Sequence, residues 1–354
     1  MSNQLPSINN DSEQILYTTF NQDSSCIAIG TEKGFKIFNT SPLKDNFRRN
    51  LDGGIGIIEM LNRSNILALV GGGLTPKFNP NKVIIWDDNQ AKILTEIRFK
   101  MNIKNIKLKR KKIFVVCDQN IYVFNFNKEF STFDTIKTFN NELGLIGYAQ
   151  ESNINIIAYP DKQIGNVTVK NYDDNNKEIT IEAHKGKINC IAMNIDGSLL
   201  ATASEKGTLI RLFNLKDGKK DLIQELRRGL ESANINCICF HSNSKFLLCC
   251  SDRGTIHIFK IKLNENSEES GNTKSIFSKI SWININNNYL NSEWSFARFR
   301  ILENKCIATF GKNNEIYVLS SNGNYYKAIF DLKNGGDCEK IEEKEILNLK
   351  IYEY

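Results

Sequence analysis

The chain repeats one pattern seven times, and this repeat constrains its fold more than any other feature. In each repeat a cluster of turn-forming residues leads into a short run of alternating apolar residues, and a second apolar run usually precedes it. The period of roughly 40 to 60 residues is typical of four-stranded propeller blades. The seven runs are Gly30–Asn39, Asn81–Asp87, Asp118–Phe126, Ile164–Tyr172, Glu205–Leu215, Asp252–Ile261 and Lys312–Ser321.

The repeats predict an all-β fold, a seven-bladed β-propeller of diverged WD repeats. Helical periodicity is weak almost everywhere, and the 354 residues include only 5 prolines. Trp86-Asp87 is the one literal Trp-Asp pair at the end of a run, and Ala183-His184 stands where WD-type blades carry Gly-His. A single blade cannot bury both of its faces, so blades stack around a central axis.

We expect a flexible N-terminus over residues 1–11, a propeller over residues 12–336 with an insertion at 262–293, and a charged tail over residues 337–354. The sequence leaves open whether the tail adds to the last blade and how the ring closes. No stretch approaches 18 consecutive apolar residues, and the N-terminus lacks the pattern of a secretion signal. We therefore expect a cytosolic protein whose nine cysteines are reduced.

Composition argues against several classes of function. The formal net charge of +6 is compatible with an anionic membrane or with nucleic acid and requires neither. The cysteines have no metal-ligand spacing and histidines number only 3, so we expect buried strand cysteines, no metal site and no cofactor. No nucleophile–base pattern is evident, so we assign no catalytic residue and do not expect an enzyme.

Two further segments depart from the repeat. The run Lys100–Lys112 contains seven basic residues, but apolar residues interleave with them, which favours a strand with one basic face over nucleic-acid contact or nuclear targeting. The loop Gly71–Pro80 lacks the Gly-Lys-Ser/Thr ending of a phosphate-binding loop, so we interpret it as a hairpin connection.

The insertion from Lys262 to Glu293 divides into two parts. Its first half, Asn264–Asn272, is polar, and we expect it to be disordered. Its second half mixes bulky apolar and aromatic residues with polar ones, which suits a membrane interface; packing onto the sixth blade is the alternative. The residues that we expect to enter the membrane are Ile276, Phe277, Ile280 and Trp282.

The stretch Leu226-Arg227-Arg228-Gly229 carries the functional hypothesis. Neighbouring side chains of an extended segment point to opposite faces, so the two arginines can serve two separate anion sites. A solvated edge strand ending in a turn is the plainer interpretation of such a pair. The segments Ser204–Thr208 and Ser251–Thr255 flank it and share a Ser-x-x-Gly-Thr pattern, which by itself is also ordinary hairpin chemistry.

These residues resemble the PROPPIN family, the phosphoinositide-binding propellers of autophagy that are called WIPI proteins in animals. The family hallmark is Phe/Leu-Arg-Arg-Gly, and its Leu form is present here. The resemblance covers nearly the whole chain except its two ends. The stretches that carry it are Leu67–Asp88, Asn155–Val169, Ala183-His184, Ala201–Asn214, Leu226–Gly229, Cys250–Ile261 and Ser295–Ile301.

The resemblance implies that phosphatidylinositol 3-phosphate and phosphatidylinositol 3,5-bisphosphate bind at two pockets on the propeller rim. The matching positions of the first site are His184, Ser204, Thr208, Arg211 and Arg227, and those of the second site are Arg228, Ser251, Thr255 and His257. Lys187 and Arg253 are weaker matches, because the family varies there. Guanidinium groups suit a phosphomonoester, since they bind two of its oxygens at once, and hydroxyl and imidazole groups supply further hydrogen bonds.

The resemblance further implies a non-enzymatic effector that recruits autophagy machinery to membranes. We expect a monomer that associates reversibly with phagophore, endosomal or vacuolar membranes, binds no nucleic acid, and docks protein partners on its second and third blades, including the run Lys107–Lys112. Two other functions remain open at this stage. One is a lipid-independent WD-type scaffold, and the other is an RNA-binding propeller that uses Lys100–Lys112.

Overall fold

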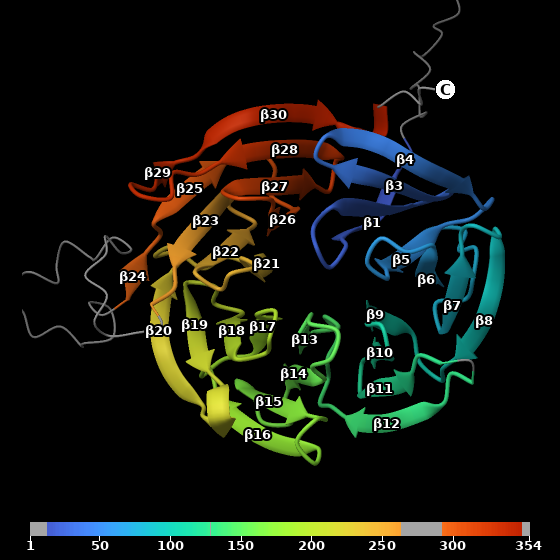
Figure 1. Ribbon diagram of the computed structural model, residues 1–354, viewed down its shortest axis with the longest axis horizontal. Coiled ribbons are helices and arrows are strands. Elements are labelled where there is room, and N and C mark those ends of the chain that lie inside the picture. The colour runs from blue at the N-terminus through green and yellow to red at the C-terminus, as the bar shows by residue number, and fades with distance from the viewer. Residues whose placement is uncertain (1–12, 128, 263–291, 349–354) are drawn as a thin grey trace, which may run out of the picture.

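The computed structural model describes residues 13–127, 129–262 and 292–348. These residues form a ring of seven sheets, each built mainly from antiparallel strands, around a central axis (Figure 1). The predicted seven-bladed β-propeller is therefore confirmed. Helix in the described part of the chain is limited to two short 3-10 segments, Lys216–Gly218 and Ile346–Asn348.

The first four blades each contain four consecutive strands. Blade one is formed by β1 (Ile15–Phe20), β2 (Cys26–Thr31), β3 (Gly34–Thr40) and β4 (Leu43–Asn50). Blade two is formed by β5 (Ile55–Met60), β6 (Ile66–Gly71), β7 (Lys82–Asp87) and β8 (Lys92–Arg98). Blade three is formed by β9 (Ile103–Leu108), β10 (Lys112–Cys117), β11 (Asn120–Asn125) and β12 (Thr132–Lys137). Blade four is formed by β13 (Gly147–Tyr148), β14 (Ile156–Pro160), β15 (Asn166–Asn171) and β16 (Lys177–Glu182).

Blades five and six include strands that come from distant parts of the chain, and blade seven skips only the short β29. Blade five is formed by β17 (Ile188–Met193), β18 (Leu199–Ser204), β19 (Leu209–Asn214), β20 (Asp221–Arg227) and the short β24 (Glu293–Trp294). Blade six is formed by β21 (Ile235–Phe240), β22 (Phe246–Ser251), β23 (Thr255–Lys260), β25 (Ala297–Arg300) and β29 (Gly336–Asp337). Blade seven is formed by β26 (Cys306–Phe310), β27 (Glu315–Ser320), β28 (Asn324–Ile329) and β30 (Glu339–Glu345).

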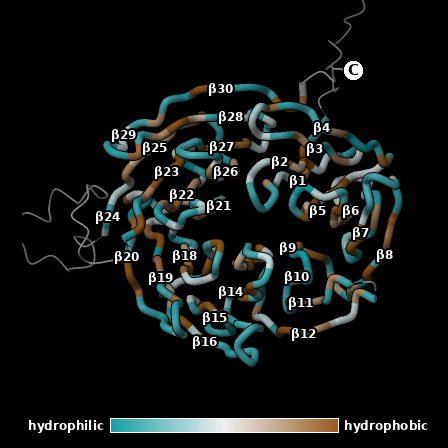
Figure 2. Tube along the Cα trace, in the orientation of Figure 1, coloured by the Kyte–Doolittle hydropathy of each residue, from teal (hydrophilic) through white to brown (hydrophobic). Residues whose placement is uncertain are grey.

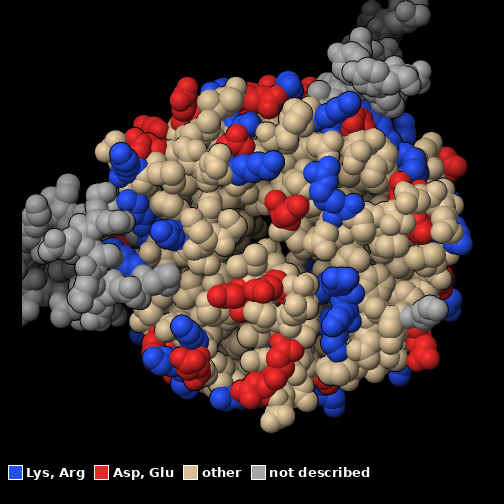
Figure 3. All heavy atoms as spheres, in the orientation of Figure 1, with Lys and Arg blue, Asp and Glu red and all other residues tan. Residues whose placement is uncertain are grey.

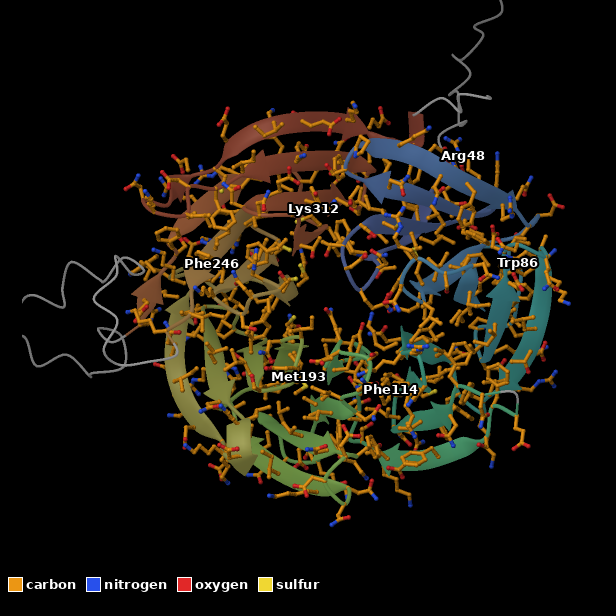
Figure 4. All side chains as sticks on the ribbon, viewed as in Figure 1. Arg48, Trp86, Phe114, Met193, Phe246 and Lys312 are labelled. Atoms are coloured by element: carbon orange, nitrogen blue, oxygen red, sulfur yellow. The ribbon has the colours of Figure 1, made fainter. Side chains whose placement is uncertain are left out.

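In the first six blades the repeated apolar runs become the third strand, and the runs before them become the second strand. In blade seven the run Lys312–Ser321 becomes the second strand, β27, and the run before it becomes the first strand, β26. The second and third strands lie in the middle of each sheet, where both faces are covered by neighbouring blades, so their residues are almost all buried, as in β2. Side chains fill the spaces between blades, where Phe246 of blade six lies in one apolar cluster with Phe310 and Phe330 of blade seven (Figure 4). The outermost strands face solvent. β30 accordingly carries mostly charged residues and is largely hydrophilic in Figure 2.

The ring closes where blade seven meets blade one. The charged segment at the C-terminal end of the chain supplies β30, and all four strands of blade one come from the N-terminal end, so the two blades share no strand. The hydroxyl of Tyr325 instead donates to the carbonyl oxygen of Thr40 at 2.7 Å, and Ser24 and Thr309 are linked through their hydroxyls at 2.7 Å. An apolar cluster that includes Ile27, Ile29, Phe38, Leu319 and Tyr325 completes the contact.

The basic run Lys100–Lys112 does not form the single basic strand face that its sequence suggested. Lys107 on β9 pairs with the buried Glu59 of blade two at 3.1 Å. Lys109 is 4 % exposed, and its ammonium group donates to the carbonyl oxygens of Ala149 and Glu151 at 2.6 and 2.7 Å. Because neighbouring blades bind these two lysines, the exposed basic residues of the run are Lys100, Arg110 and Lys111.

The hydrophobic residues expected to enter the membrane, Ile276, Phe277, Ile280 and Trp282, lie outside the described residues, so their role stays a prediction. Among the residues that the structure describes, no helix is long and apolar enough to cross a membrane.

Candidate functional site

The two Ser-x-x-Gly-Thr segments form equivalent turns on adjacent blades. Ser204–Thr208 connects β18 to β19, and Ser251–Thr255 connects β22 to β23. In each turn the glycine has a positive φ, 59° at Gly207 and 67° at Gly254, and its N–H donates to the carbonyl oxygen of the serine. The shared pattern thus has a structural cause in the turn itself. Ser251 is fully buried, and its hydroxyl accepts the N–H of Arg253 at 3.4 Å, so this serine shapes the turn.

Arg228 joins the first turn to the loop that leads to blade six. Its Nε donates to the carbonyl oxygen of Gly207 at 2.9 Å, and its Nη2 donates to the carbonyl oxygen of Glu231 in the loop that leads to blade six. Its backbone N–H donates to the carbonyl oxygen of Thr208 at 3.0 Å. The side chain is 6 % exposed, and this burial lowers the pKa of the guanidinium, which still remains charged at neutral pH. Arg228 is therefore a buried cation whose hydrogen bonds also hold two loops together.

Arg227 contacts a different part of the chain. Its Nε donates to the hydroxyl of Ser292 at 2.6 Å, just before β24, which runs parallel to β20 with Arg227 opposite Trp294. The two arginines therefore bind different segments, as the alternation along the strand predicts. Ser292 lies at the end of the insertion, so Arg227 ties the end of the insertion to the edge of blade five.

The second site is organised by the pairing of β23 with β25. Thr255 lies opposite Arg300 and His257 opposite Arg298 across an antiparallel ladder, so these four side chains share one face of blade six. Both arginines of β25 are exposed. Arg298 forms an ion pair with Asp337 of β29 at 2.6 Å, while Arg300 lies at the end of β25. The face combines a hydroxyl, an imidazole and two guanidinium groups, which is a donor set suited to a phosphate.

The first site is a corresponding row of side chains on blade five. Arg211 lies opposite Thr202 on one side and Glu225 on the other, and Arg227 occupies the same face two residues further along β20. His184 Nε2 lies 3.0 Å from the hydroxyl of Thr202.

Two residues of the first site have structural partners. The guanidinium of Arg211 is bound by the Glu225 carboxylate at 2.8 Å and the Ala183 carbonyl oxygen at 2.7 Å. Thr208, just before β19, is 7 % exposed, and its carbonyl oxygen accepts the backbone N–H of Arg228. The Glu225 carboxylate therefore neutralises the guanidinium of Arg211 in the first site.

Both histidines are held in the neutral form. Burial and the nearby guanidinium of Arg211 lower the pKa of His184 to about 4. Burial, followed by the charges of Arg228, Arg298 and Arg300, lowers the pKa of His257 to about 4. Three guanidinium groups thus act on His257, compared with one on His184. Lys and Arg side chains also gather at the left rim of the molecule in Figure 3, on the side where Figure 1 places β20 and β24.

Four residues at these sites were absent from the sequence-based assignment. Ser292 lies at the end of the insertion and binds Arg227, and Ser295 follows it with its hydroxyl 3.3 Å from His257 Nδ1. Arg298 and Arg300 alternate with buried Phe299, and this alternation was the signal that the sequence offered. Their link to His257 could not be read from the sequence because the insertion separates the two strands.

A cavity of about 190 Å³ lies away from Arg228. Exposed apolar side chains, Phe139, Leu143 and Ile164, line it together with Lys187. It adjoins the first site, because the N–H of His184 donates to the carbonyl oxygen of Gly165 in its wall. Its apolar lining does not suit a phosphate. Within the described ranges, His, Cys, Asp and Glu side chains form no group that could hold a metal ion.

Comparisons with known proteins agree with this architecture. The sequence profile of the PROPPIN family matches residues 15–347. The chain is 34 % identical to autophagy-related protein 18e of Arabidopsis thaliana, over 95 % of this chain and 89 % of the relative. It is 32 % identical to autophagy-related protein 18 of Dictyostelium discoideum, over 95 % of this chain and 94 % of the relative.

Solved structures lead to the same conclusion. The structure of Kluyveromyces lactis Hsv2 with a complete loop 6CD superposes with a TM-score of 0.77 at 25 % identity, over 95 % of this chain and all of that chain. The complex of KlAtg21 with the coiled-coil of AgAtg16 gives a TM-score of 0.76 at 24 % identity, over 94 % of this chain and 99 % of that chain. By fold, by sequence and by the resemblance that its motifs carry, this chain belongs to the PROPPIN family.

Proposed function

We propose that this protein is a non-enzymatic effector that binds 3-phosphorylated phosphoinositides at the two sites flanking Arg227 and Arg228, and so brings autophagy proteins to membranes. Phosphatidylinositol 3-phosphate and phosphatidylinositol 3,5-bisphosphate are the proposed ligands. The observation that carries the proposal is the face formed by Thr255, His257, Arg298 and Arg300, with the buried cation of Arg228 acting on the same histidine.

The chemistry of this face favours a phosphomonoester over a neutral partner. Guanidinium groups bind phosphate through paired N–H donors, and a neutral histidine can donate one further hydrogen bond. Two sites on one membrane raise the effective concentration of the second binding event, so two weak headgroup contacts can retain the protein. The protein would accordingly be cytoplasmic, monomeric and reversibly attached to phagophore, endosomal or vacuolar membranes.

Protein partners belong to the same proposal. The complex of KlAtg21 with the coiled-coil of AgAtg16 shows that a protein of this fold can bind a coiled-coil partner. We assign the partner surface of this chain to blades two and three, with Arg110 and Lys111 as the exposed basic residues of the earlier run. Lys107, which pairs with Glu59, and the buried Lys109 are engaged by neighbouring blades and do not belong to that surface.

The test is vesicle flotation with phosphatidylcholine membranes that contain or lack phosphatidylinositol 3-phosphate. Arg228 also clamps two loops, so its loss can unfold the blade, and Arg300 is the better residue to change because it is exposed. Arg300→Gln should reduce lipid-dependent flotation several-fold while the thermal midpoint is unchanged. Arg110→Gln, which removes the same charge from an exposed arginine on blade three, is the matched control and should float like the native protein.

The two alternative functions predict different results. A lipid-independent scaffold would float equally with and without the phosphoinositide, and Arg300→Gln would change nothing. An RNA-binding propeller would show a steeply salt-dependent affinity for RNA that falls in Arg110→Gln and not in Arg300→Gln. Flotation that ignores the phosphoinositide would refute the proposed lipid function.

A further inference from the structure

Two cysteines of blade six face each other across neighbouring strands. Cys237 on β21 lies directly opposite Cys250 on β22, and their sulfur atoms are 3.1 Å apart. Directly opposite residues of an antiparallel ladder have Cα atoms about 4.5 to 5.5 Å apart, which is within the range found for disulfide-bonded cysteines. Both thiols are free, but the backbone already holds them at a separation that suits a disulfide.

Blade five has the same backbone arrangement with a single sulfur atom. A β-bulge comes directly before Cys190 in β17 and directly before Cys237 in β21. Such a bulge changes the direction of the side chain that follows it. Cys190 lies opposite Ala203, however, so the cysteine pair is particular to blade six and does not follow from the architecture of the blades.

The surroundings of the two sulfur atoms differ. Cys237 Sγ accepts the N–H of Ala308 in blade seven at 3.2 Å, and Cys250 Sγ donates to the carbonyl oxygen of Cys306 at 3.4 Å or to Cys237. The hydrogen bond from the Cys250 thiol lowers the pKa of Cys237, although burial opposes this effect. Hydrogen bonds to Cys237 and Cys306, together with burial, raise the pKa of Cys250. One sulfur atom is therefore the more readily deprotonated, and the other keeps its proton.

Cys237 is also the more accessible cysteine of the pair. It is partly exposed on the innermost strand of blade six, whereas Cys250 is fully buried. Figure 3 shows the molecular face hollowed at the centre of the ring, where Figure 1 places β21. Thiolates react with small oxidants such as hydrogen peroxide, so Cys237 is the sulfur that peroxide would reach and oxidise first. Burial raises the pKa of the neighbouring Cys190 and Cys239, which makes their thiols less reactive.

We propose that Cys237 and Cys250 are a peroxide-responsive thiol pair, in which Cys237 is oxidised first and Cys250 then closes a disulfide within blade six. In the first step the Cys237 thiolate attacks one oxygen of hydrogen peroxide, the O–O bond breaks, and the other oxygen leaves as water after it takes up a proton. In the second step the Cys250 sulfur attacks the sulfenic acid of Cys237, the S–S bond forms, and the S–O bond breaks to release water with the Cys250 proton. Two thiols together lose two electrons, and one peroxide is reduced to two water molecules.

The disulfide would lie beside the turn Ser251–Thr255. Cys250 directly precedes Ser251, which lies opposite Ile235 across the same ladder. The sulfur atoms must approach from 3.1 Å to about 2 Å, so closing the bond also changes the contact of Cys237 with Ala308 of blade seven. We expect the oxidation to be transient in a reducing compartment. It does not depend on the proposed lipid function, because only the two thiols and peroxide take part.

The experiment treats the folded native protein with hydrogen peroxide, blocks the remaining thiols with iodoacetamide, and digests the protein with trypsin without a reductant. Trypsin cleaves after Lys245, so the disulfide would join peptide 229–245 to peptide 246–253. The joined peptide should appear after peroxide treatment and disappear after addition of dithiothreitol. The same two peptides also contain Cys239 and Cys249, so variants are needed to identify the bonded sulfur atoms.

Cys237→Ala and Cys250→Ala should each abolish the joined peptide. Alanine already occupies the equivalent place in blade five, at Ala203, so Cys250→Ala should fold and keep its thermal midpoint. In Cys250→Ala, peroxide should leave Cys237 as a sulfenic acid that dimedone labels, whereas Cys250 should stay unlabelled in Cys237→Ala. Cys190→Ala is the matched control, and it should form the joined peptide as the native protein does.

Four results would overturn the proposal. A joined peptide that persists in either alanine variant would show that other cysteines carry the bond. No joined peptide in the native protein, at a peroxide concentration that oxidises free cysteine in solution, would show that the pair is inert. A joined peptide that forms only after unfolding in urea would show that the folded strands prevent the reaction. Dimedone labelling of Cys250 in place of Cys237 would contradict the order of oxidation.

Discussion

Arg228 Nε lies 2.9 Å from the carbonyl oxygen of Gly207, so the arginine assigned to the second site holds the turn that belongs to the first. The same side chain binds the carbonyl oxygen of Glu231 in the following loop. A substitution that moves the Arg228 side chain would therefore disturb both the turn of the first site and the loop that leads to blade six. The Arg-Arg pair is a structural link between two blades as well as a pair of cations.

Substitution of the two glycines near this link should change the stability of the protein to very different extents. A Cβ at Gly207 would lie 1.8 Å from the carbonyl oxygen of Ala233, and the residue has a positive φ of 59°. Gly207→Ala should therefore lower the free energy of unfolding by about 2 kcal/mol or more, measured by urea denaturation. A Cβ at Gly229, the glycine of the Leu-Arg-Arg-Gly motif, meets nothing within 4 Å. Gly229→Ala should change stability by less than about 0.5 kcal/mol, and equal losses in both variants would contradict this account.

The sequence predicted the repeated core of the propeller well. All seven alternating runs became central strands of their blades, because alternation and buried β-branched residues are typical of a strand that is covered on both faces. It could not predict β24 and β29, since two-residue strands that pair in parallel across long separations leave no local pattern. Ring closure was equally hidden, because it depends on side-chain contacts such as Tyr325 with Thr40.

The candidate sites were predictable only in part. Arg228, Thr255 and His257 were assigned from motif and resemblance, and the structure brings them near one another. Arg300 was not assigned, because its place opposite Thr255 depends on the register of β25 against β23, which the sequence does not show. The prediction for the basic run Lys100–Lys112 was wrong for a similar reason. Carbonyl groups of blade four bind Lys109 and remove it from the surface, and the sequence pattern of the run does not indicate this contact.

Lowering the pH should destabilise the protein through its buried histidines. The pKa of His257 is about 4 in the folded protein and about 6.5 in the unfolded chain, so between these values the unfolded chain binds a proton that the folded protein does not. The free energy of unfolding therefore falls as the pH drops from 7 toward 4. Below pH 4, His257 causes no further loss. The expected contribution is roughly 1 to 2 kcal/mol at pH 5.

Comparison with a histidine variant isolates this effect from titrating carboxylates. The free energy of unfolding of the native protein and of His257→Gln should be measured at pH 7 and pH 5. The loss between the two pH values should be smaller in His257→Gln, because glutamine does not titrate. If both proteins lose the same stability, His257 does not hold the lowered pKa assigned to it.

Lys109 gives the last prediction, because it distinguishes a structural lysine from a binding surface. Its ammonium group donates to three carbonyl oxygens of blade four, those of Ala149, Glu151 and Ile154, and so pins the β9–β10 turn to the neighbouring blade. Lys109→Met keeps the length of the side chain but leaves these carbonyl groups without their donor, which should cost about 2 to 4 kcal/mol of unfolding free energy. Lys111→Met, at the exposed end of the same turn, should change stability by less than about 0.5 kcal/mol. Partner or RNA binding that depends on Lys109 while the folded state keeps its full stability would show instead that this lysine faces a ligand.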